Sequence, residues 1–76
     1  MKLTEELRSN LARILFEKKE AGKEVKQKEI ASALGVTTAQ VSAWINGKTY
    51  PRAVKLYQLA KLLDVKVDDL YELKED

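Results

Sequence analysis

The residues able to do chemistry are concentrated in the middle of this chain. Residues 26–61 hold six basic side chains and one acidic one, whereas residues 62–76 hold two basic and six acidic. The same middle block contains Thr38, Gln40 and Ser42, whose side chains donate and accept hydrogen bonds. This pattern favours non-covalent binding of a polyanion to the middle of the chain and not to its end. Ordinary solvated helix faces would carry similar charges, so charge alone leaves both interpretations open.

Covalent and metal chemistry have little support in the composition. The 76 residues include no cysteine and no histidine, which excludes disulfides, thiolate chemistry and the usual zinc sites. Asp68 and Asp69 are adjacent, and neighbouring helix residues do not face each other as a catalytic carboxylate pair would. No apolar run approaches membrane-spanning length. We expect one intracellular domain spanning residues 1–76, with no enzymatic activity, cofactor, metal, membrane contact or evident small-molecule ligand.

Two short helices joined by a tight turn are expected to position the central polar residues. Ile30 and Leu34 give the first helix an apolar side, and Gly35 follows where a helix commonly ends in a left-handed residue. Thr37 is a favourable N-cap for the next helix, and Gln40 lies three residues further on, as a capping box requires. This spacing predicts a helix-turn-helix.

The second helix of that motif is expected to turn one side outward. Val41 and Trp44 form its apolar side, and we interpret Trp44 as a core residue. The opposite side then carries four small residues, Thr38, Ala39, Ser42 and Ala43, with Gln40 at its edge. Good capping and helix propensity alone would also explain Thr38 and Ala39.

The full pattern predicts a compact all-α fold. Apolar spacing indicates five helices and no strand, with helices at about 4–20, 27–34, 38–46, 53–63 and 67–73. Asn46-Gly47 is expected to end the third of these helices.

The chain resembles the Cro/C1-type helix-turn-helix family, especially the DNA-binding domains of lambda-type phage repressors. The resemblance is carried by an ordered set of residues: FEKKE at 16–20, Gln27, Ala31, Leu34-Gly35-Val36, Val41, Ile45-Asn46-Gly47 and LAKLLDVKVDDL at 59–70. It implies a five-helix lambda-repressor-like domain, prokaryotic or phage-encoded and cytoplasmic, that binds a pseudo-palindromic operator in double-stranded DNA as a dimer and represses transcription. The alternative is a protein-interaction or antitoxin-like adaptor on the same fold.

The resemblance also implies roles for individual residues. The base-reading positions would be Thr38, Ala39, Gln40, Ser42 and Ala43, and the positions contacting the DNA backbone would be Gln27, Asn46, Lys48, Thr49, Tyr50, Arg52, Lys18 and Lys19. No Arg or Asn is available on the reading side for a two-bond contact with a base, so we expect modest direct readout. In relatives, the glutamine that matches Gln27 also braces a long base-reading side chain at the position of Thr38. The side chain of Thr38 is too short to be braced in this way.

The last predicted helix is expected to form the dimer interface. Val67, Leu70, Tyr71 and Leu73 supply more apolar surface than a short terminal helix needs for docking, and the family pairs through the corresponding helix. Packing of all four residues within one chain is the alternative.

Overall fold

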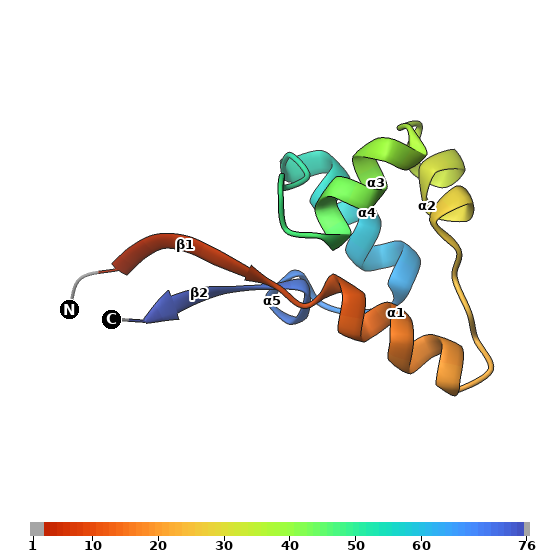
Figure 1. The fold of residues 1–76 in the computed structure, drawn as a ribbon, viewed down its shortest axis with the longest axis horizontal. Coiled ribbons are helices and arrows are strands. Elements are labelled where there is room, and N and C mark those ends of the chain that lie inside the picture. Colours follow the sequence, from red (N-terminus) through yellow and green to blue (C-terminus); the bar gives the residue numbers. More distant parts are fainter. Residues whose placement is uncertain (1–2, 76) are drawn as a thin grey trace.

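Five helices and a two-stranded antiparallel sheet make up the described part of the chain; the sheet is called the hairpin below, although the five helices separate its two strands. The computed structural model describes residues 3–75, with side chains described for residues 6–73. In chain order the elements are β1 (Leu3–Ser9), α1 (Leu11–Glu20), α2 (Gln27–Leu34), α3 (Thr38–Ile45), α4 (Ala53–Leu63), α5 (Val67–Leu70) and β2 (Tyr71–Glu75). The helices form a compact body, and the hairpin extends from one side of it (Figure 1).

The hairpin joins the two ends of the described chain and corrects the all-α prediction. β1 and β2 run antiparallel, with Leu7 opposite Leu73 and Ser9 opposite Tyr71. The first helix was predicted to begin near residue 4 and the last to end at 73, and both predictions were wrong. Pairing between segments distant in sequence satisfies the backbone of both, and this outweighs the local helix propensity of residues 3–9.

Asn10 fixes the junction between β1 and α1. Its backbone N–H donates to the Leu70 carbonyl at 2.8 Å, and its side-chain amide donates to the Asp69 carbonyl at 3.1 Å and to Glu72 Oε1 at 3.0 Å. Asn10 is buried, so these bonds also satisfy a polar group shielded from water. The start of α1 is therefore set by contacts with the other end of the chain.

The helix-turn-helix forms where the sequence predicted it. α2 ends at Gly35, which has a left-handed φ of 70°. Thr37 and Gln40 form a capping box: Gln40 N–H donates to Thr37 Oγ1 at 3.1 Å, and Thr37 N–H donates to Gln40 Oε1 at 2.9 Å. α2 and α4 have the predicted bounds, and α3 ends one residue early, with Asn46 as its C-cap. The turn between α2 and α3 is therefore encoded by local signals.

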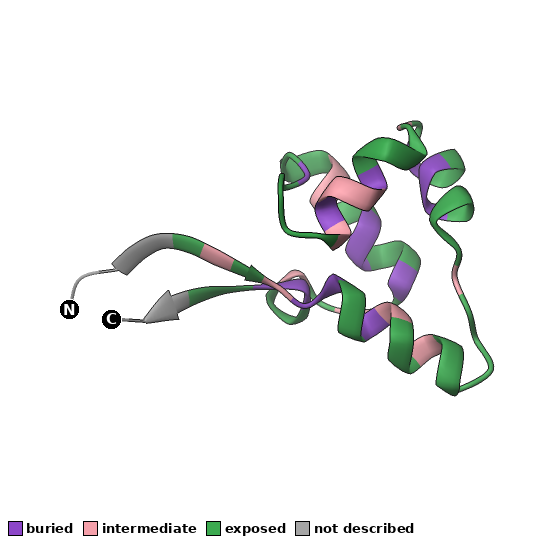
Figure 2. Ribbon diagram, in the orientation of Figure 1, coloured by how far each residue is buried: buried purple, intermediate pink, exposed green. Residues whose placement is uncertain are grey.

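The core lies between the helices and reaches the base of the hairpin (Figure 2). Its buried members are Leu11, Ile14, Ile30, Ala31, Leu34, Val41, Trp44, Leu59, Ala60, Leu63, Leu70 and Tyr71. Trp44 is only 5% exposed, which confirms its assignment to the core. No described helix is both long enough and apolar enough to cross a membrane.

Candidate nucleic-acid interface

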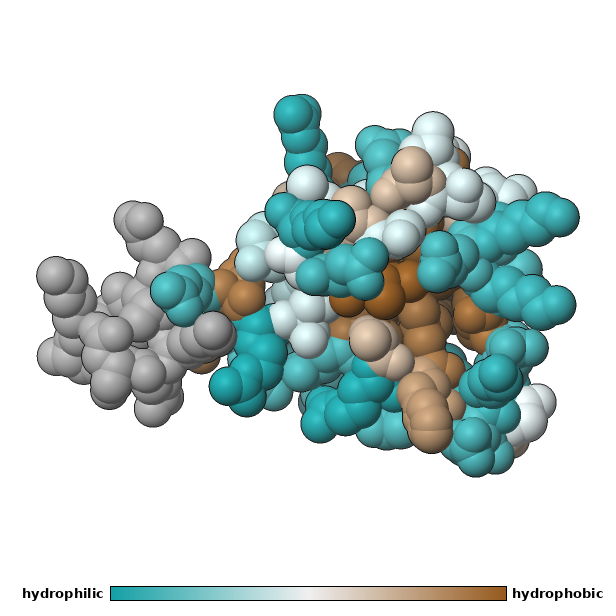
Figure 3. Space-filling model, in the orientation of Figure 1, coloured by the Kyte–Doolittle hydropathy of each residue, from teal (hydrophilic) through white to brown (hydrophobic). Residues whose placement is uncertain are grey.

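The outward side of α3 carries the five predicted base-reading residues. Thr38, Ala39 and Gln40 are exposed, and the list is completed by Ser42 and Ala43, which are half-buried. Val41 and Trp44 hold the opposite side in the core. Figure 3 shows mainly hydrophilic and neutral side chains over α2 and α3, whereas hydrophobic side chains gather between α3 and α1. The first turn of α3 is therefore available to a ligand outside the body.

Gln40 has two tasks at this surface. Its side-chain oxygen accepts from the Thr37 N–H and, at 3.3 Å, from the Thr37 hydroxyl, so the oxygen belongs to the turn. The amide nitrogen of the same side chain can contact a ligand, and to that ligand it can only donate hydrogen bonds.

A groove runs beside α3. It is lined by three of the five predicted base-reading residues and by the loop that follows α3. Its volume is about 540 Å³, and it is lined by Val36, Ala39, Gln40, Ala43, Trp44, Thr49, Tyr50, Pro51, Arg52 and Lys55. Arg52 is exposed and Lys55 is half-buried, and the described lining includes no acidic side chain. The groove therefore combines neutral, small side chains from α3 with two positive charges, a combination that suits an anion.

Lys55 was not among the predicted site residues. Its ammonium group donates to the Leu34 carbonyl at the end of α2, so it neutralises the negative end of that helix while lining the groove. Its spacing in α4 is that of any surface lysine, so no local signal marked this position in the sequence.

The predicted backbone-contacting residues fall into separate groups. Thr49, Tyr50 and Arg52 line the groove beside α3. Two others, Lys19 and Gln27, line a different hollow between α1 and the start of α2.

The remaining backbone-contacting residues lie outside both hollows. Asn46 and Lys48 are exposed after α3, and Lys18 is half-buried. The side-chain amide of Asn46 donates to Ser42 Oγ at 3.5 Å. Lys19 forms a long ion pair with Glu24 at 3.9 Å, and both partners are largely exposed, so water weakens the pair and leaves Lys19 able to exchange partners.

Tyr50 makes contacts that the sequence did not suggest. Its hydroxyl donates to the Leu7 carbonyl of β1 at 3.2 Å. Its ring meets the ring of Tyr71 edge-on, with centroids 5.6 Å apart and planes at 81°. The hydroxyl expected to face a phosphate is thus engaged by the hairpin.

The four predicted dimer residues do not form one helical face. Leu70 is fully buried and Tyr71 is 8% exposed, and both belong to the core. α5 ends at Leu70, so Leu73 lies on β2, where it is 49% exposed. A dimer helix spanning 67–73 is therefore wrong as predicted, and Val67 and Leu73 are the two members that reach the surface.

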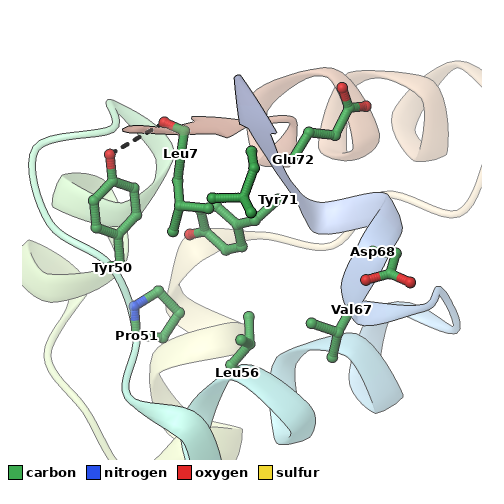
Figure 4. Close-up of a pocket in the computed structure, with 9 residues that line it drawn as sticks. Leu7, Tyr50, Pro51, Leu56, Val67, Asp68, Tyr71 and Glu72 are labelled. Carbon is green, nitrogen blue, oxygen red and sulfur yellow. Dashed lines mark hydrogen bonds between the residues drawn. The ribbon is translucent and has the colours of Figure 1, made fainter. Parts of the chain in front are cut away.

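Val67 and Leu73 border an apolar hollow of about 560 Å³ between the hairpin and the helical body (Figure 4). Its lining is completed by Leu7, Tyr50, Pro51, Leu56, Asp68, Tyr71 and Glu72. Burial raises the pKa of the Tyr71 phenol, and the neighbouring Ser9 side chain opposes this rise only in part. The hollow carries carboxylates where the groove beside α3 carries cations.

An exposed helix flanked by a basic groove, presented by a helix-turn-helix, defines a DNA-binding module. A family model described as Helix-turn-helix matches residues 18–70, and the chain belongs to the Cro/C1-type helix-turn-helix family. DNA binding and transcription regulation are the activities that this membership supports, and the family is generally non-enzymatic. The described residues contain no cluster of side chains able to hold a metal ion.

A solved structure, a transcriptional regulator from Listeria innocua, is similar to this chain with a TM-score of 0.66 and 32% sequence identity. The similarity covers 91% of this chain and 64% of that one, so this chain spans less than two thirds of the length of the Listeria protein. A search of curated proteins found no match.

Proposed function

We propose that this protein is a sequence-specific regulator of transcription that binds double-stranded DNA as a homodimer and represses from a pseudo-palindromic operator. The observation that carries the proposal is the exposed first turn of α3, bordered by a groove with Arg52 and Lys55 on its wall. The similarity to a transcriptional regulator from Listeria innocua supports the same class of function.

In this proposal α3 enters the major groove. That groove accommodates one helix and exposes the base edges to it. Thr38 and Ser42 can donate to or accept from several bases, and the methyl groups of Thr38, Ala39 and Ala43 can contact thymine. These side chains are short, so the helix must approach the bases closely and each base contact contributes modestly.

The backbone contacts then hold the helix in place. Lys48 and Arg52 supply positive charge from the loop after α3, and Thr49 and Asn46 supply hydrogen bonds. Gln27 is the first residue of α2, whose unpaired N–H groups favour a phosphate. Lys18 and Lys19, in the last turn of α1, add two positively charged side chains for contact with phosphates.

The dimer is proposed to form through the apolar hollow between the hairpin and α5. Val67 and Leu73 lie on its border, and Leu7 and Leu56 add apolar surface. Two copies related by a two-fold axis would place their α3 helices about 34 Å apart on one face of the duplex. A single module makes few phosphate contacts, so pairing also supplies the affinity that one copy lacks.

Selection of bound duplexes from a random library tests this function. The expected result is an enriched motif with two related half-sites about one helical turn apart, retained in a gel-shift assay and weakened by salt. The Arg52→Ala variant is the control for backbone charge. If no duplex is retained even at low salt, the regulator proposal fails and the adaptor alternative takes its place.

A further inference from the structure

The loop after α3 separates two hollows of opposite character. Tyr50 and Pro51 line both the basic groove beside α3 and the apolar hollow beside the hairpin. The first hollow is lined by two cationic residues and the second by two acidic ones, Asp68 and Glu72. One side of the loop therefore faces the proposed DNA surface, and the other side faces the hairpin.

Backbone hydrogen bonds hold the start of the loop after α3. Gly47 N–H donates to the Trp44 carbonyl at 3.2 Å, Lys48 N–H and Thr49 N–H donate to the Ala43 carbonyl at 2.9 and 3.4 Å, and Pro51 at the far end is buried. The loop begins at Gly47, whose φ of 74° is a left-handed conformation that glycine adopts without steric strain. Between these two ends, the side-chain contacts of Tyr50 connect the loop to the rest of the molecule.

Tyr50 connects this loop to both strands of the hairpin. Its hydroxyl donates to Leu7 on β1, and its ring packs edge-on against Tyr71 on β2 (Figure 4). A second connection joins β1 to the end of α3, where Ser9 Oγ donates to the Trp44 carbonyl at 3.4 Å. The hairpin thus contacts the reading helix and the following loop at separate points.

We infer that Tyr50 is a positioning residue, and that through its bond to Leu7 the hairpin holds the DNA-facing loop in its binding conformation before DNA arrives. The inference rests on the proposed function for its consequence in DNA binding. A loop already ordered loses less conformational entropy on association, so its charged and polar groups bind more tightly. Tyr50 then contributes to DNA affinity without donating to a phosphate.

The experiment compares Tyr50→Phe with Tyr57→Phe. The first change removes the hydroxyl that donates to Leu7 and keeps the ring that packs on Tyr71. The second removes a hydroxyl from a tyrosine on α4 that is 66% exposed, and so controls for the chemical change itself. Amide hydrogen exchange of the protein without DNA, affinity for a selected duplex, and the denaturant midpoint are measured for both variants and the parent.

We expect Tyr50→Phe to speed exchange at residues 47–50 and 6–9, two segments distant in sequence, while core amides of α4 stay protected. Its affinity for DNA should fall by about two- to tenfold, the range for losing one neutral hydrogen bond. Tyr57→Phe should match the parent in all three measurements.

Other outcomes overturn the inference in distinct ways. Weaker DNA binding with unchanged exchange in the free protein would make Tyr50 a direct DNA contact. Faster amide exchange throughout the molecule would show that Tyr50 stabilises the whole fold and not this loop in particular. Unchanged DNA affinity would show that binding does not depend on the bond between Tyr50 and Leu7. If the parent retains no duplex, the proposed function fails, while the exchange comparison still tests whether Tyr50 orders the loop.

Discussion

Replacing Lys48 and Arg52 together with alanine should weaken DNA binding by an amount that depends on salt. Both side chains are exposed, and Arg52 lines the groove beside α3. The ion pairs of the described residues involve Arg13 with Glu17 and Lys19 with Glu24, so neither changed residue gives up an internal partner. The loss of DNA affinity should therefore measure contacts with the phosphate backbone, and the double substitution should leave folding nearly unchanged.

The magnitude follows from counterion release. Each phosphate contact contributes about 0.9 to the slope of log affinity against log salt concentration, so the double variant should flatten that slope by about 1.8 for each bound protomer. Between roughly 50 and 200 mM salt, the ratio of parent to variant affinity should then shrink by about 12-fold for one protomer and about 150-fold for a dimer. Fluorescence anisotropy with a labelled duplex over a salt series measures both quantities.

A matched double variant separates position from charge. Lys61→Ala with Lys66→Ala also removes two exposed cations, and neither residue lines the groove beside α3. It should lower affinity slightly through the net charge and keep most of the parent slope. If the Lys48 and Arg52 variant keeps the parent slope as well, or if both double variants lose it equally, the assignment of these residues to phosphate contact is wrong.

Four further substitutions test other parts of the molecule. Ala39→Arg adds a long donor to the exposed side of α3, so a repeated duplex selection should return a motif shifted toward guanine while the free energy of unfolding changes by less than about 0.5 kcal/mol. Leu70→Ala should cost about 2–5 kcal/mol in urea denaturation because Leu70 is fully buried, whereas Leu73→Glu should keep the fold and give a monomer in sedimentation velocity. Because burial raises the pKa of Tyr71 above its ordinary 10.0, unfolding becomes easier as pH rises past that value, and Tyr71→Phe should remove part of this dependence in denaturant midpoints.

The helix-turn-helix could be predicted from the sequence because its signals are local. Gly35 sets one helix end through a backbone conformation, and the Thr37 and Gln40 pair sets the next start through two hydrogen bonds within four residues. Val41 and Trp44 are buried as their spacing indicated, which places the small residues of α3 outward. A motif encoded in this way needs no knowledge of the rest of the fold.

The hairpin could not be predicted by the same reasoning because its partners lie at opposite ends of the chain. Residues 3–9 contain Leu, Glu and Arg, which favour a helix, and Leu7 and Leu11 have helical spacing. The alternation of apolar and polar residues from Tyr71 to Lys74 was the available signal for a strand, and interpreting it as the end of a helix also misplaced Leu73. The contacts of Tyr50 are with the two strands of the hairpin, so its proposed role could not be predicted either.

The small side chains of α3 determine where specificity must arise. Thr38, Ala39 and Ser42 cannot make the two-bond contacts that give each base pair its largest discrimination. Affinity in the proposed complex therefore comes mainly from the loop cations, which do not read sequence, and selectivity must come from placing two such helices at a fixed spacing and from the shape of the duplex between them. A hairpin that borders the proposed dimer surface and also holds the loop through Tyr50 would bring both requirements under one structural element, because a shift of either strand would move the spacing and the phosphate contacts together.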